Sequence, residues 1–139
     1  MSPSPSIAGR PVRILIVDDE RDNRELLELV LAWAGFLILT AASGEEALTT
    51  VAQQPPDLIL LDVMMPGMTG YEVAAKIKGN IATKSIPVIM VSALTDRKAR
   101  TLGLSAGAED FLAKPLERAE LVSRVRNCLR KTYADYHDE

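Results

Sequence analysis

The chain has 139 residues, of which 47% are apolar and 25% are charged, and its formal net charge is −3. This length fits one globular domain, and the small negative charge argues against a surface that binds nucleic acid directly. No apolar run approaches the roughly 20 residues that a membrane-spanning helix needs. The single cysteine, Cys128, cannot form an internal disulfide, which suits a cytoplasmic protein.

Residues 1–11 are rich in serine and proline, and we expect them to be a disordered lead-in. They lack the apolar segment of a signal peptide. The expected domain covers residues 12–131. The polar segment 132–139 is expected to be a C-terminal tail or the start of a linker, with His137 exposed to solvent.

Short apolar runs alternate with amphipathic segments along the expected domain. The runs suit strands buried on both faces of a sheet, and they cover residues 12–17, 36–40, 58–61, 88–91 and 111–113. Strict alternation of strands with helices predicts βαβ units, a parallel sheet and helices on both of its faces.

The segments between and after these runs carry helix signals. Ser43 with Glu46, and Thr69 with Glu72, have the spacing of capping boxes. The first predicted helix has its apolar stripe within residues 26–34, and the last predicted helix has its stripe within residues 121–129. Trp33 and Cys128 belong to these stripes, and we expect both to pack in the core.

Polar side chains follow four of the five runs at the carboxyl end. Asp18 and Asp19 follow the first run, Asp62 the third, Ser92 the fourth and Lys114 the fifth. In open parallel sheets, ligands bind outside the carboxyl ends of the strands. If the first and third strands are neighbours, the three carboxylates converge on one crevice. A lone aspartate at such a position is usually a solvated turn residue, but this ordered set favours a site.

Three clustered carboxylates repel one another, and a hard divalent cation such as Mg²⁺ would offset that repulsion. One carboxylate could then act as a nucleophile toward phosphorus. Phosphoryl transfer depends mainly on positioning and on charge neutralisation. Mg²⁺ and Lys114 would neutralise the phosphoryl oxygens, and the Ser92 hydroxyl would hydrogen-bond one of them.

Four motifs, in this order, resemble the response-regulator receiver family. They are Val-Asp-Asp-Glu at 17–20, Leu-Asp-Val-Met-Met-Pro-Gly-Met-Thr-Gly at 61–70, Val-Ser-Ala at 91–93 and Ala-Gly-Ala-Glu-Asp-Phe-Leu-Ala-Lys-Pro at 106–115. The resemblance covers residues 12–131. It implies a single doubly wound (βα)5 domain of the α/β class, with a five-stranded parallel sheet of order 2-1-3-4-5.

The resemblance also implies roles for the acidic residues. Asp62 corresponds to the phosphoacceptor. Asp18 and Asp19 correspond to the acidic pair that holds Mg²⁺, with Asp19 as the direct ligand and Asp18 acting through water. The backbone carbonyl of Met64 corresponds to a further metal ligand, alongside Asp62.

Three other positions match parts of the family's switch. Ser92 corresponds to the Ser/Thr switch residue, Lys114 to the invariant lysine and Phe111 to the switch aromatic. The Lys114–Pro115 bond corresponds to one that is usually cis. Met64 and Leu94 border the site, and we expect them to tune the lifetime of the phosphorylated form.

The resemblance predicts a phosphorylation switch of a two-component phosphorelay. A sensor histidine kinase or a histidine phosphotransfer protein donates to Asp62, Ser92 moves inward and Phe111 turns into the vacated space. The surface formed by the fourth helix, fifth strand and fifth helix changes, and a downstream output protein or domain reads it. Self-association into a homodimer would use the same surface. On this hypothesis the chain is a signalling switch that acts on its own side chain and is not a turnover enzyme.

The alternative functions are a Mg²⁺-dependent phosphohydrolase and a flavodoxin-like FMN carrier. A Mg²⁺-dependent phosphohydrolase with an aspartate nucleophile usually has two first-strand aspartates separated by one residue and a large cap, whereas Asp18 and Asp19 are adjacent. A flavodoxin-like FMN carrier needs a phosphate loop rich in Ser, Thr and Gly after the first strand. The acidic segment 18–20 would repel a phosphate there.

Overall fold

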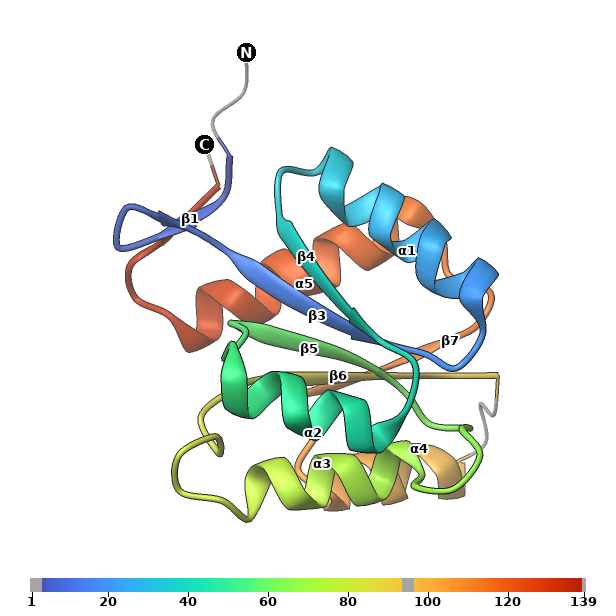
Figure 1. The fold of residues 1–139 in the computed structure, drawn as a ribbon. Helices are drawn as coiled ribbons and strands as arrows, with labels where there is room; N and C mark the ends of the chain where they lie inside the picture. The colour runs from blue at the N-terminus through green and yellow to red at the C-terminus, as the bar shows by residue number, and fades with distance from the viewer. Residues whose placement is uncertain (1–3, 94–96, 139) are drawn as a thin grey trace.

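The computed structural model describes residues 4–93 and 97–138 (Figure 1). Within these residues, five parallel strands form the central sheet, and their order is β4-β3-β5-β6-β7. The strands are β3 (Arg13–Val17), β4 (Leu37–Ala41), β5 (Leu58–Asp62), β6 (Val88–Ser92) and β7 (Asp110–Ala113). In chain order this is 2-1-3-4-5, so the predicted fold class and topology are confirmed.

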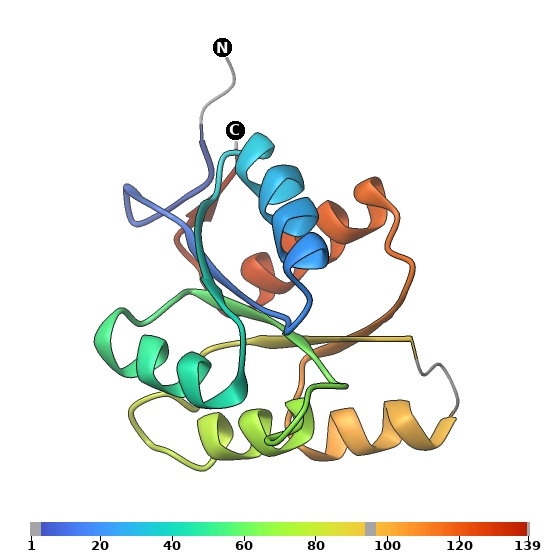
Figure 2. The same ribbon diagram turned by 45° about the vertical axis from the view of Figure 1, so that its right-hand side comes forward.

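Helices cover both faces of the sheet (Figure 2). One face carries α1 (Arg21–Trp33) and α5 (Arg118–Thr132), and the other carries α2 (Gly44–Gln53), α3 (Gly70–Lys78) and α4 (Arg97–Ser105). Successive side chains of a strand point to opposite faces. Each apolar run therefore contributes side chains to two hydrophobic cores, one on each face of the sheet.

The side chains of β3 show this division. Leu15 and Val17 pack with α2, α3 and α4, whereas Ile14 and Ile16 pack with α1 and α5. All four are at most 1% exposed. This burial on both faces is the physical reason why the strand reads as a continuous apolar run.

The predicted helix caps are formed, one of them in part. At α3, Thr69 and Glu72 make a complete capping box. At α2, the Ser43 hydroxyl accepts a hydrogen bond from the Glu46 N–H, but the Glu46 carboxylate accepts from Ala42 instead of from Ser43. Both helices therefore begin where the sequence predicts.

The expectation of a disordered lead-in is wrong for the described residues 4–11. Strands β1 (Ser6–Ile7) and β2 (Arg10–Pro11) form a hairpin, and β8 (Tyr136–His137) pairs antiparallel with β1. Ala8 and Gly9 have φ values of 51° and 82°, as a tight two-residue hairpin turn requires. The serine and proline content misled the prediction because the partner strand comes from the other end of the chain.

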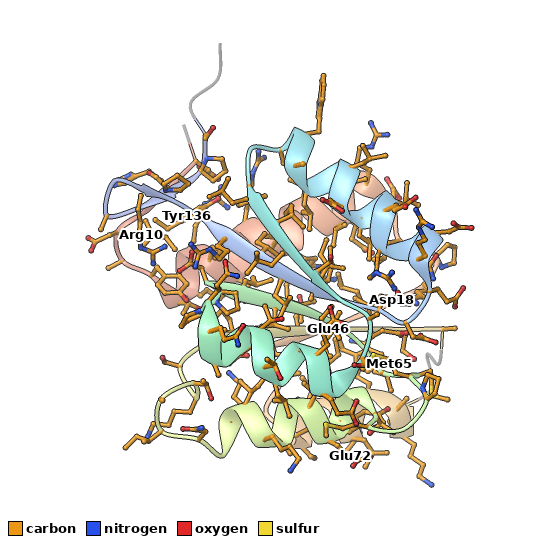
Figure 3. The ribbon with its side chains drawn as sticks, in the orientation of Figure 1. Arg10, Asp18, Glu46, Met65, Glu72 and Tyr136 are labelled. Atoms are coloured by element: carbon orange, nitrogen blue, oxygen red, sulfur yellow. The ribbon has the colours of Figure 1, made fainter. Side chains whose placement is uncertain are left out.

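The terminal sheet, defined as β1, β2 and β8, contributes side chains to the core that lies between the central sheet and helices α1 and α5. Ile7 and Tyr136 are 6% and 8% exposed and pack in that core. Arg10 and Tyr136 lie at the end of the central sheet opposite Asp18 (Figure 3). His137 is exposed, as expected, although it lies in β8.

Trp33 is 89% exposed, so the expectation that it packs in the core is wrong. Leu27 and Leu31 are the residues through which α1 packs on the sheet. Leu26 and Leu29 of the same helix are 60% and 69% exposed. The helix is apolar on two sides, and periodicity alone did not show which side faces the sheet. Cys128 is buried, as predicted.

No helix within residues 4–93 and 97–138 combines the length and apolarity that crossing a bilayer requires.

Candidate functional site

The carboxyl ends of β3 and β5 are neighbours, because Val17 pairs with Leu61 in the sheet. This register brings Asp18, Asp19 and Asp62 together. Each contributes a carboxylate oxygen, and these oxygens lie within 4.8 Å of one another. Asp18 and Asp62 are buried and Asp19 is half-buried. The convergence predicted from the strand ends is therefore present.

The Lys114 ammonium lies between two of these carboxylates. Its Nζ atom is 3.3 Å from Asp18 Oδ2 and 3.4 Å from Asp62 Oδ1. The backbone N–H of Lys114 donates to the Ser92 carbonyl, which fixes this end of β7 against β6. The Lys114–Pro115 peptide bond is cis.

Burial raises the pKa of Asp62 to about 6, and the Asp18 charge acts in the same direction. The Lys114 ammonium and the backbone N–H of Met64 oppose this increase. For Lys114, burial lowers the pKa, but the Asp62 and Asp18 charges outweigh it, so the pKa is higher than usual and the ammonium stays charged. One positive charge thus contacts two of the three clustered acidic side chains.

Backbone contacts hold Asp18 in place. Its Oδ1 accepts a hydrogen bond from the Glu20 N–H at 2.9 Å, and its carbonyl accepts one from Arg24 at 2.8 Å. Sequence reasoning did not identify Arg24. Its spacing of six residues from Asp18 is not a motif, and the contact depends on the direction that α1 takes after strand β3.

Gly70 is a second residue whose role was not predicted in detail. It is the first residue of α3, and a Cβ atom there would collide with the Asp62 carbonyl and lie 2.8 Å from Val63 Cα. The backbone N–H of Gly70 donates to the Val63 carbonyl at 2.9 Å. The absent side chain therefore lets α3 begin directly behind the phosphoacceptor candidate. The Thr-Gly pair at 69–70 was the available signal for this turn.

The switch candidates lie on adjacent strands. Ser92 is fully buried at the end of β6, and Phe111 on β7 is 2% exposed. The Phe111 ring is therefore already in the interior in this structure. The Met64 side chain is 58% exposed. Leu94, the other residue expected to border the site, lies outside the described residues.

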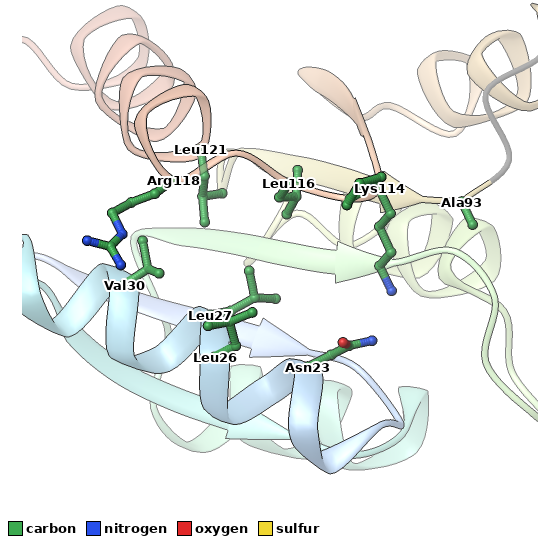
Figure 4. Close-up of a pocket in the computed structure, with 10 residues that line it drawn as sticks. Asn23, Leu26, Leu27, Val30, Ala93, Lys114, Leu116, Arg118 and Leu121 are labelled. Carbon is green, nitrogen blue, oxygen red and sulfur yellow. The ribbon is translucent and has the colours of Figure 1, made fainter.

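A groove of about 560 Å³ runs beside Lys114, between α1 and the segment that joins β7 to α5 (Figure 4). Its lining is mostly aliphatic, with Lys114 at one end and Arg118 near the other. The aliphatic side chains include Leu26, Leu27, Val30, Leu116 and Leu121. The three carboxylates do not line this groove, so the acidic cluster and the groove are separate features that meet at Lys114.

Comparison with known proteins gives consistent matches. The family model described as the response regulator receiver domain matches residues 14–126. Response regulator PleD of Caulobacter vibrioides is 47% identical over 118 residues, which are 85% of this chain and 26% of that protein. The DNA-binding response regulator MtrA of Mycolicibacterium paratuberculosis is 43% identical over 119 residues, or 86% of this chain and 52% of that protein.

Solved structures agree with these matches. The chemotaxis protein CheY4 of Vibrio cholerae has a TM-score of 0.81 and 30% identity, covering 85% of this chain and 98% of that chain. The curated relatives are longer. This chain spans about a quarter of PleD and about half of MtrA.

Proposed function

The chain belongs to the response regulator receiver domain family, and we propose that it is a phosphoacceptor switch in which Asp62 receives the phosphoryl group. The family acts in two-component signalling. One observation supports the assignment of Asp62 more strongly than the others do. The Asp62 carboxylate is buried, clustered with Asp18 and Asp19, and within 3.4 Å of the Lys114 ammonium.

The donor set at this site fits Mg²⁺. Three carboxylates offer oxygens within 4.8 Å of one another, and Lys114 balances one of their charges. Hard oxygen ligands of this kind are those that Mg²⁺ prefers. Asp18, Asp19, Asp62 and the Met64 carbonyl would hold the ion. When bound, the ion would neutralise charge on the oxygens of the phosphoryl group.

In the proposed transfer, an Asp62 carboxylate oxygen forms a bond to phosphorus while the bond between phosphorus and a donor phosphohistidine nitrogen breaks. The imidazole leaves with the electron pair of that bond. Lys114 is placed to keep Asp62 oriented and to pair with the added negative charge. Ser92 ends the strand next to Asp62, and its hydroxyl would donate to a phosphoryl oxygen.

The donor is proposed to be a sensor histidine kinase or a histidine phosphotransfer protein. The signal would leave through Ser92, Phe111 and the surface of α4, β7 and α5, where a downstream output protein or domain, or a second copy of the chain, would bind. MtrA is named a DNA-binding regulator, but this chain matches 52% of it and carries a net charge of −3. We therefore propose no direct nucleic-acid contact for residues 12–131, the proposed receiver domain. A cytoplasmic location and slow self-dephosphorylation belong to the same proposal.

The first test is Asp62→Asn, assayed with Mg²⁺ and acetyl phosphate by intact-protein mass spectrometry. The original chain is expected to gain one phosphoryl group that hydroxylamine removes, as for an acyl phosphate. Asp62→Asn is expected to gain none, because an amide cannot form an acyl phosphate. Circular dichroism is expected to be unchanged, since the substitution keeps shape and removes one of three repelling charges.

Asp22→Asn is the matched control, because Asp22 is an exposed carboxylate on α1. It is expected to be phosphorylated like the original chain. Phosphorylation of Asp62→Asn at the original site and rate would contradict the assignment. Sustained release of phosphate from a small phosphate ester would instead support the phosphohydrolase alternative, which the comparisons do not favour.

A further inference from the structure

The Phe111 ring lies against a helix position that has no side chain. Gly103 of α4 is buried, and a Cβ atom placed there would be 2.8 Å from Phe111 Cδ2 and 3.1 Å from Cε2. It would also be 3.2 Å from Met90 Sδ on β6. Carbon atoms do not approach at 2.8 Å without a shift, so a side chain at 103 and the present ring position exclude each other.

Backbone conformation does not explain the glycine. Gly103 lies within α4 and is not among the glycines with positive φ. In a helix interior, glycine is among the least favourable residues, because it loses more conformational entropy than any other. The feature that glycine offers at this position is therefore space.

Arg100 of α4 also contacts Phe111, and α4 is in turn linked to α3. The Arg100 guanidinium carbon is 5.4 Å from the centroid of the Phe111 ring, and Arg100 Nη1 donates to the Phe111 carbonyl at 3.4 Å. The Tyr71 hydroxyl donates to the Ala99 carbonyl at 3.2 Å, which links α4 to α3. Ala99 precedes Gly103 by four residues and is buried on the same face.

We propose that Gly103 is a positioning residue of the switch, forming the notch that admits the Phe111 ring while α4 is seated on β7. The inference deepens the proposed function and rests on it, because the ring and α4 are the parts through which the phosphoryl signal would leave the site. On this proposal, the inward position of the Phe111 ring and the packing of α4 against β7 occur together in one conformational state. Displacing either one must move the other.

The chain contains two phenylalanines, Phe36 and Phe111, so 4-fluorophenylalanine labelling gives two fluorine resonances. Phe36 is 4% exposed and packs in the core beneath α1 and α5, away from α4, so it is an internal reference. Phe111→Leu assigns the signals. The experiment uses the full chain with Mg²⁺ and beryllofluoride, a phosphoryl analogue whose own bound fluorine signals report occupancy of Asp62 in the same spectrum.

Gly103→Ala is the test variant. With beryllofluoride bound, the Phe111 fluorine of the original chain is expected to show little change in chemical shift between H₂O and D₂O. In Gly103→Ala, the Phe111 signal is expected to become solvent-sensitive, or the α4 amide signals to shift, while Phe36 stays unchanged. Thr101→Ala, at an exposed position of α4, also increases helix propensity and is expected to change neither signal.

Bound beryllofluoride signals in both the original chain and Gly103→Ala would show that Asp62 is occupied in each sample, so that the notch is tested separately from the assignment of Asp62. Their absence in the original chain would reject the proposed function instead. A Phe111 fluorine that stays buried in Gly103→Ala, with α4 amides unmoved, would overturn the notch. If Gly103→Ala does not fold, the double variant Gly103→Ala/Phe111→Leu is expected to fold because the ring is gone, and its failure would also overturn the inference.

Discussion

Lys114 lies at the contact point of two features, the acidic cluster and the aliphatic groove. Its side chain is 22% exposed, and its ammonium contacts carboxylates that are 2% and 6% exposed. In such a partly dry site a charge acts more strongly than it does at the surface. Lys114 therefore matters most where extra negative charge arrives, as it does when a phosphoryl group is transferred.

We predict that Lys114→Met slows phosphorylation of Asp62 by acetyl phosphate by roughly 10²- to 10³-fold, the usual loss on removing one preorganised group that stabilises developing charge. The rate is measured by intact-protein mass spectrometry at fixed Mg²⁺. Magnesium affinity is expected to be maintained or increased, because the ammonium and Mg²⁺ repel each other. An isothermal titration with Mg²⁺ separates this outcome from collapse of the site.

Lys76→Met is a suitable control for that variant, since Lys76 is an exposed lysine on α3. Its phosphorylation rate is expected to match that of the original chain. An unchanged rate in Lys114→Met would show that the contact with Asp62 has no part in the transfer.

The site residues differ in how far the sequence could predict them. Asp18, Asp19 and Asp62 were predictable together because each follows a strand in a parallel sheet, where carboxyl ends share one edge. The sequence could not show that the Phe111 ring is inside and seated against Gly103, because that contact depends on how close α4 approaches β7. Propensity alone would have scored Gly103 as a weak point of the helix.

At the scale of elements, the central strands were predicted almost to the residue. Leu58–Asp62 and Val88–Ser92 match the predicted runs because strands covered on both faces are apolar throughout. The edge strand Leu37–Ala41 starts one residue later than predicted. Of its five residues only Ala41 is buried, and the other four are half-buried or exposed. Weaker burial gives a weaker pattern, which explains the shift.

Helix α3 is fitted against β5 through Gly70, and this fit makes an element-scale prediction. Gly70→Ala is expected to lower the free energy of unfolding by about 1–3 kcal/mol, as overpacking does when backbone must move. A Cβ atom at this position would meet the Asp62 carbonyl and Val63, so β5 and α3 must separate. The loop that carries Met64 would shift with them. Urea denaturation and a Mg²⁺ titration are expected to show lower stability and weaker binding together.

Gly67→Asn is the comparison for Gly70→Ala. Gly67 has a φ of 75°, and a Cβ atom there meets nothing within 4 Å, so asparagine, which tolerates this conformation, is expected to be nearly neutral. Equal stability of Gly70→Ala and Gly67→Asn would mean that the fit of α3 against β5 is not tight.

At the scale of the whole molecule, strands β1 and β8 bring together residues from the N-terminal and C-terminal parts of the chain, at the end of the central sheet opposite Asp18 (Figure 3). Asp57 connects this terminal sheet to the central one. It is buried and accepts hydrogen bonds from the two terminal guanidinium nitrogens of Arg10, Nη1 and Nη2, at 2.8 and 2.7 Å, and from the Arg13 N–H. The Tyr133 hydroxyl donates to the Asp57 carbonyl, which adds α5 to the same junction. No local pattern in the sequence could have joined residues so far apart.

We predict that Arg10→Ala lowers the free energy of unfolding by about 1 kcal/mol, measured by urea denaturation. The Arg10 side chain is 54% exposed, so solvent screens part of the attraction, but the Asp57 side chain is only 7% exposed and would be left with fewer donors. Arg21→Ala is the matched control, because the Arg21 and Glu25 side chains are 81% and 56% exposed, and its effect is expected to be near zero. Hydrogen exchange of the β1 and β8 amides should accelerate in Arg10→Ala and not in Arg21→Ala. Equal stability and equal exchange in the two variants would mean that the terminal sheet is held by the packing of Ile7 and Tyr136 and not by the buried carboxylate.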